Sequence, residues 1–409
     1  MRHRYVIVGG GAAGASAIAG IRRHDPDGGI LMLARENHAP YQRPPLSKDL
    51  WFGRATLEQL PLRREEYYRE RGVELMLRRE VVELDPERHL VWDERGVEHG
   101  YDRLLLATGG RPRRLVLPGV EIAGLHYFRN LEDYVHLSRR LDRFEHALVV
   151  GGGFIGVELA AALRHAGKEV TLLVDREYPL FRVLPRELGL ALAERFRREG
   201  VETVSEDRLV ALEESQGLIR AHTASGGVIS TQLVLAGVGL EPETDLAEAA
   251  GLDVDDGVVV DEFARTTDPD VYAAGDVARY PCVPLGRSLR AEHWEHALAH
   301  GRCAGANLAG ATEPYEGIPY FFSDLFDLGF EGVGDLDPTL RVETVWREPG
   351  QPTADGGTAG VVFTLRDDVV RGVLLWNVRG AVDWARALVR AGLPTTASER
   401  AAAVPWGEK

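Results

Sequence analysis

The feature that most constrains the fold is a strand, a glycine-rich loop and a helix in succession near the N-terminus. Residues 5–8 are apolar and read Tyr-Val-Ile-Val, which predicts a buried strand. The loop Gly-Gly-Gly-Ala-Ala-Gly follows over 9–14, and small residues predict a helix over 15–23. This Gly-x-Gly-x-x-Gly arrangement is typical of dinucleotide-binding βαβ units. One copy alone is weak evidence for such a site.

The same pattern returns at residues 147–163, with a strand over 148–150 and Gly-Gly-Gly-Phe-Ile-Gly over 151–156. In both copies a second strand follows, at 29–34 and at 169–174. An acidic residue then comes about 20 residues after the last glycine, as ribose binding requires; these acids are Glu36 and Asp175. The double match favours two dinucleotide sites over two βαβ units that merely pack.

Two dinucleotide sites in one chain indicate that one dinucleotide passes electrons to the other. FAD and NAD(P)H form the natural pair, because flavin accepts a hydride and can release electrons singly. We therefore expect FAD and NADH as cofactors, with NADPH left open.

Composition excludes several other classes of protein. The 409 residues predict two or three domains, and a net charge of −15 argues against nucleic acid as a general partner.

The basic start and the apolar stretch over 5–21 resemble a signal peptide, but the glycine spacing and the acid favour the strand. No stretch reaches the roughly 18 apolar residues of a membrane span. We expect a cytoplasmic protein with reduced thiols and no membrane span.

Other segments fit an α/β chain with an α+β end. Strands are expected over 73–85, 90–92, 101–106, 233–236 and 271–274. The last of these ends at Gly275-Asp276, which would place an acid at the carboxyl end of a parallel strand, where ligands bind. The alternative for Asp276 is a helix cap. From residue 318, strands are expected over 320–325, 329–333, 341–346, 360–365 and 369–376, with a hairpin turn at Asp367-Asp368, then a helix over 381–391 and a loose end over 395–409.

The run Pro-Tyr-Gln-Arg-Pro-Pro-Leu-Ser-Lys-Asp-Leu-Trp over 40–51 resembles the flavin-contact loop of the pyridine-nucleotide flavoprotein reductases. The resemblance is greatest to the ferredoxin-reductase branch and to apoptosis-inducing factor, and it extends from Tyr5 to about Leu336. It also includes Gly-Leu-Glu-Pro over 239–242, Glu-His-Trp over 292–294 and Phe-Phe-Ser-Asp over 321–324.

The resemblance implies a glutathione-reductase-like α/β fold with two Rossmann-type domains and a C-terminal α+β domain. The FAD domain would comprise 1–114 and 242–317, the inserted NAD(P)H domain 115–241, and the interface domain 318–409.

The resemblance also implies roles for individual residues. The positions matching FAD contacts are Gly9, Gly11, Gly14, Glu36, Arg43, Lys48, Val81, Thr108, Gly109, Arg113, Asp276, His293, Trp294 and Phe322. The positions matching NAD(P)H contacts are Gly151, Gly153, Phe154, Gly156, Glu158, Asp175, Arg176, Gly239, Glu292 and Glu331. Phe322 stands where relatives usually have tryptophan, and its alternative is an ordinary interior aromatic.

Lys48 is one of three lysines in an arginine-rich chain, so a lysine beside a flavin suggests that a compact ammonium is needed. A buried unpaired charge is costly, which means that Lys48 needs an anion. In the family's pattern this anion is Glu158. We predict a Lys48–Glu158 ion pair at the flavin that tunes and positions rather than transfers a proton.

The two cysteines, Cys282 and Cys303, lie far from the 41–51 loop, which contains none. Disulfide reductases and thiol peroxidases of this fold need cysteine in that region, so we expect both thiols to be structural and no metal site. Electrons would leave singly, to a ferredoxin, a rubredoxin, a quinone or an artificial acceptor. The charge of −15 opposes approach to an acidic carrier unless arginine clusters offset it locally.

Asp175 would bond a ribose 2′-hydroxyl and favours NADH, whereas Arg176 and Arg182 could hold a 2′-phosphate. Relatives often carry the acid one position earlier, at Val174. Two alternatives to a carrier reductase stay open. One is an apoptosis-inducing-factor-like NADH-binding redox sensor with slow turnover, and the other is a flavoprotein that acts as a binding module. A homodimer is also left open.

Overall fold

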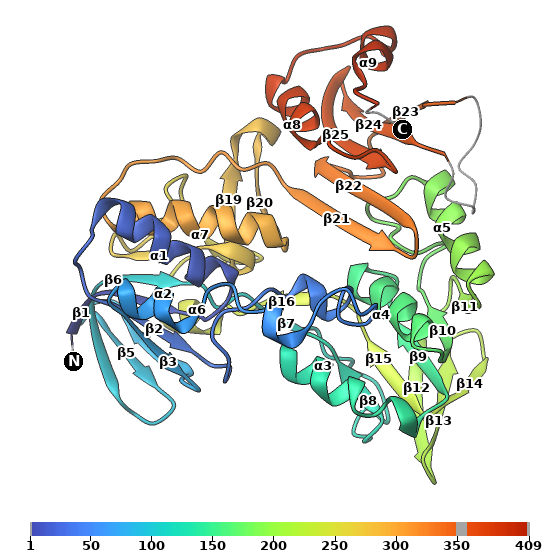
Figure 1. Cartoon of the computed structure of the whole chain (residues 1–409), viewed down its shortest axis with the longest axis horizontal. Helices are drawn as coiled ribbons and strands as arrows, with labels where there is room; N and C mark the ends of the chain where they lie inside the picture. The colour runs from blue at the N-terminus through green and yellow to red at the C-terminus, as the bar shows by residue number, and fades with distance from the viewer. Residues whose placement is uncertain (1, 349–357, 407–409) are drawn as a thin grey trace. The chain divides into compact units, whose positions relative to one another are not determined.

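The computed structural model describes residues 2–348 and 358–406 (Figure 1). By its contacts the chain forms two compact units, each of which is built from three segments. The first comprises Met1–Gln42, Leu57–Arg111 and Glu241–Tyr320, and the second comprises Arg43–Thr56, Pro112–Leu240 and Phe321–Lys409. Three strands contain points where the chain passes between units: β7 (Gly110–Pro112), β16 (Leu240–Pro242) and β21 (Tyr320–Leu325). The three-domain division stays a prediction.

The first unit is centred on a sheet with the strand order β3-β2-β1-β6-β5-β4, and β18 also pairs with β6. Strands β1, β2, β3, β6 and β18 run parallel. Strand β2 reads Ile-Leu-Met-Leu-Ala and is buried throughout, as expected for a parallel strand covered on both faces. The described elements of this unit are β1 (Arg2–Val8), α1 (Ala12–His24), β2 (Ile30–Ala34), η2 (Leu57–Gln59), α2 (Glu65–Glu70), β3 (Val73–Leu77), β4 (Val81–Asp85), β5 (Leu90–Asp93), β6 (Glu98–Leu106), α6 (Asp245–Ala249), β17 (Val258–Val259), β18 (Val271–Ala273), η4 (Gly275–Val277), β19 (Ala278–Cys282), η5 (Val283–Leu285), β20 (Arg287–Arg290) and α7 (Trp294–Leu308).

Helices α1 and α7 pack closely because glycines line their contact. A Cβ atom at Gly301 would lie 2.2 Å from the Ala13 carbonyl oxygen, and one at Gly305 would lie 2.1 Å from that of Ala17. Backbone therefore touches backbone, and α7 from its middle onward lies against the first turns of α1.

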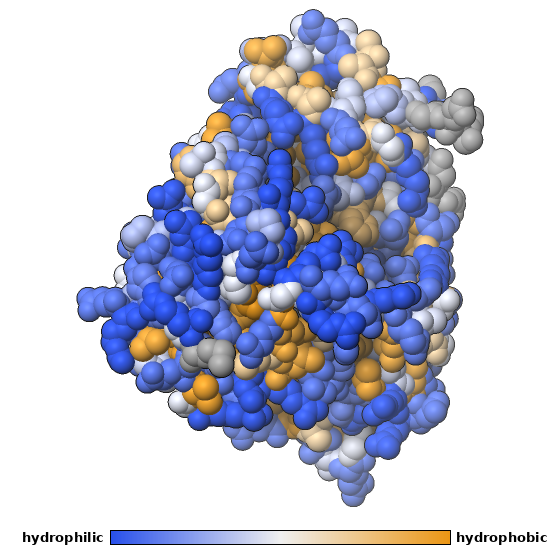
Figure 2. Space-filling model, turned by 60° about the vertical axis from the view of Figure 1, so that its left-hand side comes forward, coloured by the Kyte–Doolittle hydropathy of each residue, from blue (hydrophilic) through white to orange (hydrophobic). Residues whose placement is uncertain are grey.

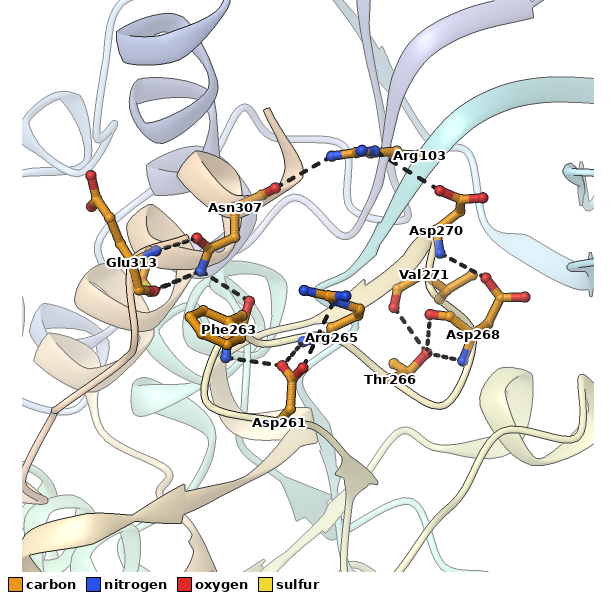
Figure 3. Close-up of polar contacts among 11 residues, drawn as sticks. Arg103, Asp261, Phe263, Arg265, Thr266, Asp268, Asp270, Val271, Asn307 and Glu313 are labelled. Atoms are coloured by element: carbon orange, nitrogen blue, oxygen red, sulfur yellow. Dashed lines mark hydrogen bonds and ion pairs between the residues drawn. The ribbon is translucent and has the colours of Figure 1, made fainter. Parts of the chain in front are cut away.

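Asn307 ties the end of α7 to two loops (Figure 3). Its Nδ2 donates to the carbonyl oxygens of Phe263 and Glu313 at 3.0 and 2.8 Å, and its Oδ1 accepts from the Glu313 backbone N–H at 2.8 Å. Asn307 is 2% exposed, so these bonds satisfy an amide that would otherwise be costly to bury.

The turn that leads into β18 is held by its own polar side chains (Figure 3). Thr266 Oγ1 donates to the Val271 carbonyl at 2.9 Å, and Asp261 Oδ1 accepts from the Arg265 backbone N–H at 2.8 Å. These bonds fix where β18 begins, and hence where the Gly275-Asp276 segment after it lies.

The second unit repeats the first strand–loop–helix arrangement. Its parallel sheet has the order β11-β10-β9-β15-β8, and an antiparallel sheet has the order β12-β13-β14. The described elements up to residue 240 are η1 (Pro44–Leu46), β8 (Leu125–Tyr127), α3 (Leu131–Ser138), η3 (Leu141–Arg143), β9 (His146–Val150), α4 (Phe154–His165), β10 (Glu169–Leu173), α5 (Arg186–Arg198), β11 (Val201–Val204), β12 (Leu209–Ser215), β13 (Leu218–Thr223), β14 (Val228–Thr231) and β15 (Leu233–Ala236).

The C-terminal part of this unit is an antiparallel sheet in the order β21-β22-β25-β24-β23. Its further elements are β22 (Leu328–Gly334), β23 (Arg341–Trp346), β24 (Gly360–Arg366), β25 (Val369–Trp376), α8 (Val382–Ala391) and α9 (Ala397–Ala403). The predicted hairpin turn is confirmed: Asp367 and Asp368 have φ of 51° and 63°, as a type I′ turn requires.

The prediction of a loose end over 395–409 is wrong over 397–403, where the chain forms helix α9. Helix α9 begins with a capping box, in which the Thr396 side chain accepts from the Glu399 N–H and the Glu399 side chain caps the N–H of Thr396. Arg400 is 3% exposed and bonds Glu343 on β23, which anchors the helix to the sheet. Residues 407–409 of the predicted loose end lie outside the described residues.

Hydrophilic residues cover most of the face shown in Figure 2, and the apolar residues on it form separate patches. Among the described helices, none combines the length and apolar character that a bilayer crossing needs.

Candidate dinucleotide sites

The first glycine loop joins β1 to α1, and the fold requires two of the three glycines of its Gly-x-Gly-x-x-Gly motif. Gly9 has a φ of 122°, and a Cβ there would lie 2.1 Å from the Ala107 carbonyl oxygen. A Cβ at Gly14 would lie 2.3 Å from the Gly9 carbonyl oxygen. Gly11 differs, because a Cβ there would meet no atom of the described residues within 4 Å.

The second loop, between β9 and α4, repeats this geometry. Gly151 has a φ of 113°, and its Cβ would lie 2.3 Å from the Gly237 carbonyl oxygen. A Cβ at Gly156 would lie 1.9 Å from the Gly151 carbonyl oxygen, while Gly153 again faces open space. Each loop therefore has two glycines where a side chain would clash with backbone and one glycine in open space, at the same spacing.

The two open glycines test whether these loops fit a dinucleotide. Gly11 and Gly153 are the N-cap residues of α1 and α4, and neither helix has a side-chain cap. The first backbone N–H groups of each helix are thus left for a ligand, with the positive end of the helix dipole behind them. A pyrophosphate needs this combination of space, donors and positive potential, so both loops fit one.

The acids occupy the expected places after β2 and β10. Glu36 accepts a 2.6 Å hydrogen bond from the Tyr41 hydroxyl, which orients its carboxylate. Val174 is 1% exposed, whereas the Asp175 side chain is 67% exposed. The acid is therefore displaced from the Val174 position to the first exposed residue after β10. Arg176 lies beside it, with 3.8 Å between Nε and the Asp175 carboxylate.

The carboxyl ends of β1, β6 and β18 lie side by side, because these strands pair in parallel with Val8, Leu106 and Ala273 in register. Thr108-Gly109 follows β6, and Thr108 Oγ1 donates to the Glu243 carbonyl at 2.9 Å. Gly275-Asp276 follows β18.

Asp276 is the middle residue of η4, whose N-cap position is Ala274, so it does not cap that short helix. The alternative of a cap on another helix stays a prediction. A Cβ at Gly275 would lie 2.8 Å from the Ala13 Cβ, which places η4 against the start of α1. Asp276 is thereby held close to the first glycine loop.

His293 and Trp294 lie at the N-terminus of α7, and His293 is its N-cap residue. Burial lowers the pKa of His293 to about 4, although the nearby Asp276 carboxylate opposes this shift. His293 is therefore neutral at neutral pH. Trp294 packs against the core cluster of this unit. Glu292 precedes them and accepts a 2.6 Å bond from Arg290.

The predicted Lys48–Glu158 contact is confirmed in the second unit. Lys48 Nζ lies 3.0 Å from Glu158 Oε1, and the two side chains are 12% and 6% exposed. Lys48 Nζ also donates to the Phe322 carbonyl at 3.3 Å and lies 4.3 Å from the centre of the Phe322 ring. Phe322 is 36% exposed, so the alternative of an ordinary interior aromatic is wrong. Its position at a flavin stays a prediction.

Two serines that the sequence patterns did not single out complete this group. Ser47 Oγ donates to Glu158 Oε2 at 2.6 Å, and Ser323 Oγ donates to Glu158 Oε1 at 2.9 Å. The available signal was their position, since Ser47 directly precedes Lys48 and Ser323 directly follows Phe322.

The other predicted contacts are distributed over both units. Arg43 Nη1 donates to the Arg129 carbonyl at 2.9 Å, and the Phe154 ring lies 4.9 Å from that of Phe321. The Arg113 backbone N–H donates to the Gly239 carbonyl at 2.9 Å, which joins a predicted FAD residue to a predicted NAD(P)H residue within the second unit. Val81 begins β4 and Glu331 lies on β22.

The cysteines have the environment of structural thiols. Cys282 is buried, and its Sγ lies 3.5 Å from the Gly317 carbonyl. Burial raises the pKa of the Cys303 thiol to about 11, which suppresses the thiolate needed for disulfide exchange. Among the described residues, no group of three or more histidine, cysteine, aspartate or glutamate residues is arranged to hold a metal ion.

A cluster of four buried rings in the first unit was also not predicted. It consists of Tyr280, His296, His300 and Tyr315. The ring centres of Tyr280 and His296 are 4.8 Å apart, those of His300 and Tyr315 are 4.5 Å apart, and His296 Nδ1 lies 2.9 Å from the Tyr315 hydroxyl. The His293-x-x-His296-x-x-x-His300 spacing, typical of one helix face, was the available signal.

We expect this cluster to make the protein sensitive to acid. Burial lowers the pKa of His296 to about 4 and that of His300 well below its usual value. Between pH 6.5 and 4 the unfolded chain therefore binds protons that the folded chain does not. The contribution of these histidines to the free energy of unfolding is fully present above pH 6.5 and is lost as pH falls through this range. Proton binding linked to His296 alone should lower the free energy of unfolding by about 2 kcal/mol between pH 7 and 5.

Urea unfolding of the parent protein and of His300→Phe at both pH values measures this dependence. Phenylalanine keeps the ring but cannot titrate, so the variant should lose less stability on acidification. An equal loss in both proteins would contradict the assignment.

Known proteins share this arrangement along most of the chain. The family model described as pyridine nucleotide-disulphide oxidoreductase matches residues 3–301. A rubredoxin-NAD(+) reductase of Pseudomonas putida is 34% identical over 332 residues, which cover 81% of this chain and 86% of that protein. The mitochondrial apoptosis-inducing factor 1 of Dictyostelium discoideum is 32% identical over 419 residues, which cover 94% of this chain and 78% of that protein.

A chain in the crystal structure of the covalent putidaredoxin reductase–putidaredoxin complex superimposes with a TM-score of 0.89 and 32% identity, over 97% of this chain and 95% of that chain. This likeness confirms the predicted fold class, as do the two parallel sheets, in each of which one strand leads into a glycine loop.

Proposed function

Since this chain belongs to the pyridine nucleotide-disulphide oxidoreductase family, we propose that it passes electrons from NADH, through FAD, to a one-electron carrier protein of the ferredoxin or rubredoxin type. The family and the related NAD(+) reductases make the chain an FAD-dependent NAD(P)H oxidoreductase. The carrier is the finer part of the proposal. Electron transfer between two dinucleotides is supported by one main observation. The two glycine loops have the same geometry, and each has one open glycine at a helix N-terminus.

Named residues would hold each cofactor. The α1 N-terminus at Gly11 would take the FAD pyrophosphate and Glu36 its adenosine ribose, and Gly153 and Asp175 would do the same for NADH. Bound FAD supplies the ability to accept a hydride and release electrons one at a time. The neutral His293 in the first unit, and separately the Lys48–Glu158 pair in the second, would each offer polar groups to a bound cofactor.

A carrier protein is favoured over a disulfide substrate by the thiols. The loop over 41–51 contains no cysteine, Cys282 is buried, and the Cys303 pKa is raised to about 11. Relatives named for rubredoxin, and the putidaredoxin complex, support a small iron–sulfur or iron protein as the acceptor. The net charge of −15 means that an acidic carrier would need a locally basic docking face.

Stopped-flow reduction followed by mixing with acceptors tests the proposal. NADH should bleach the flavin rapidly under anaerobic conditions, and oxidised ferredoxin or rubredoxin should restore it rapidly. Slow reduction, slow reoxidation and a change of molecular mass with NADH would instead support the redox-sensor alternative. Reoxidation by a quinone but by neither carrier would overturn the choice of acceptor, and no reduction by NADH would overturn the proposal as a whole.

Asp175 should set the preference for NADH over NADPH. Its carboxylate would bond a ribose 2′-hydroxyl and repel a 2′-phosphate, whereas Arg176 would remain to attract that phosphate. Asp175→Ala should therefore raise the ratio of kcat/KM for NADPH to that for NADH by about tenfold, the equivalent of about 1.4 kcal/mol. Arg176→Ala, measured in the same assay, should move the ratio the other way. A parent enzyme with equal kcat/KM values for NADPH and NADH would contradict the assignment.

A further inference from the structure

Glu158 is a buried carboxylate that accepts hydrogen bonds on both oxygens. Oε1 receives Lys48 Nζ at 3.0 Å and Ser323 Oγ at 2.9 Å, and Oε2 receives Ser47 Oγ at 2.6 Å. An ionised carboxylate is costly to bury unless such donors replace water. The ion pair is therefore one part of a group with three donors.

The donors come from two segments, and each segment contacts the ion pair twice. Ser47 and Lys48 are neighbours in the segment after η1, and both bond Glu158. Phe322 and Ser323 are neighbours on β21: the Phe322 carbonyl accepts from Lys48 Nζ, and Ser323 donates to Glu158. The four contacts close a ring between α4, β21 and this segment, so neither charge can shift without breaking a bond.

The serines contribute directionality that a lysine cannot supply. An ammonium is a compact point charge with three donors, whereas a serine hydroxyl has a single proton, which each serine here gives to one Glu158 oxygen. Bonds to an ionised acceptor are stronger than neutral ones. Ser47 and Ser323 are 4% and 1% exposed, so water does not compete for their protons.

We propose that Ser47 and Ser323 are positioning residues, which fix the plane of the Glu158 carboxylate and through it the place of the Lys48 ammonium during hydride transfer. The inference rests on the proposed function, because the ammonium matters to the reaction only if FAD binds beside it. It adds to the ion pair two hydroxyls that act through Glu158.

Ser47→Ala and Ser323→Ala, purified with FAD, test the inference. The limiting rate of flavin reduction at saturating NADH should fall about tenfold in each, the weaker end of what a lost charge-assisted bond produces. The NADH concentration that gives half the limiting rate should change less than twofold, because neither serine lies at a glycine loop. The flavin midpoint potential, measured by dye equilibration without NADH, should become more negative by about 30 mV, the tenfold equivalent for two electrons.

Three further variants separate positioning from folding. Ser47→Cys and Ser323→Cys keep nearly the same volume with a much weaker donor, and they should show the same losses if the alanine variants fail to bind FAD. Ser138→Ala is the matched control, because Ser138 bonds within its own helix, to the Val135 carbonyl at 3.1 Å, and not to Glu158 or Lys48. It should leave rate and potential unchanged.

A double-mutant cycle with Glu158→Gln tests whether the serines act through Glu158. In that background, Ser47→Ala should change the rate by less than a further twofold. Folded serine variants with parental rates and potentials, or full additivity in the cycle, would overturn the inference and leave the proposed function standing. Parent protein that NADH cannot reduce would overturn the proposed function, and the potentials would still report on the serines.

Discussion

Gly153→Ala is expected to weaken NADH binding at least tenfold, about 1.4 kcal/mol or more, with no loss of stability. Gly153 has a φ of −79°, which alanine adopts freely, and within the part of the chain that the structure describes its Cβ would meet no atom within 4 Å. The methyl group would instead occupy the space above the α4 N-terminus that a pyrophosphate needs. The KM for NADH should rise, whereas FAD content and melting temperature should match the parent.

Two glycines bracket this prediction. Gly29→Ala is the matched control, because its Cβ also faces open space but Gly29 belongs to neither loop. It should change neither KM nor stability. Gly156→Ala should destabilise the fold, because its Cβ would lie 1.9 Å from the Gly151 carbonyl oxygen. If Gly153→Ala bound NADH as tightly as the parent, the second loop would not be the NADH site.

The same substitution in the first loop should affect the other cofactor. Gly11→Ala has the same open surroundings and a φ of −91°, so it should lower FAD content while NADH binding to the second loop survives. A variant that lost NADH but kept FAD would reverse the assignment of the two loops.

Lys48→Met is expected to lower the free energy of unfolding by about 3–5 kcal/mol, because it leaves the Glu158 carboxylate buried without its cation. The limiting rate of flavin reduction should also fall by about 100-fold, which is the usual effect of removing one preorganised electrostatic group. Chemical denaturation measures the first effect and stopped-flow absorbance the second.

Lys168→Met is the matched control. The Lys168 side chain is 11% exposed, close to the 12% of Lys48, but its partner Glu145 is 80% exposed and 3.7 Å away. Its loss should cost less than about 1 kcal/mol. The double variant Lys48→Met/Glu158→Gln should recover part of the lost stability, because it removes the orphaned charge. No recovery would show that the lysine acts through its packing on Phe322 instead.

Local patterns predicted the elements and loops well, because strand periodicity and glycine spacing are carried by neighbouring residues. Both glycine loops, the five C-terminal strands and the Asp367-Asp368 turn follow from such patterns. Helix α9 was missed because its small residues suggested a loose end, although the Thr396-x-x-Glu399 capping box was visible.

The ring around Glu158 could be predicted only in part. The ion pair followed from the cost of burying an unpaired lysine, but the serine bonds depend on segments 111 and 165 residues apart in sequence. Which hydroxyl reaches which oxygen is decided by how η1, α4 and β21 meet, and no local pattern encodes that. The buried rings around His296 were missed for the same reason, since Tyr280 and Tyr315 lie outside α7.

The three-segment construction of the first unit has a consequence for synthesis on the ribosome. The edge of β6 at Leu104–Leu106 pairs with β18, which is made only after the whole 112–240 segment. These three leucines are at most 1% exposed in the folded protein, and the nascent chain leaves their β18-side backbone edge unpaired for more than a hundred residues of elongation. The parallel sheet that ends with β15 is complete by residue 236 and can form first, so a chain stalled before β18 would be the aggregation-prone one.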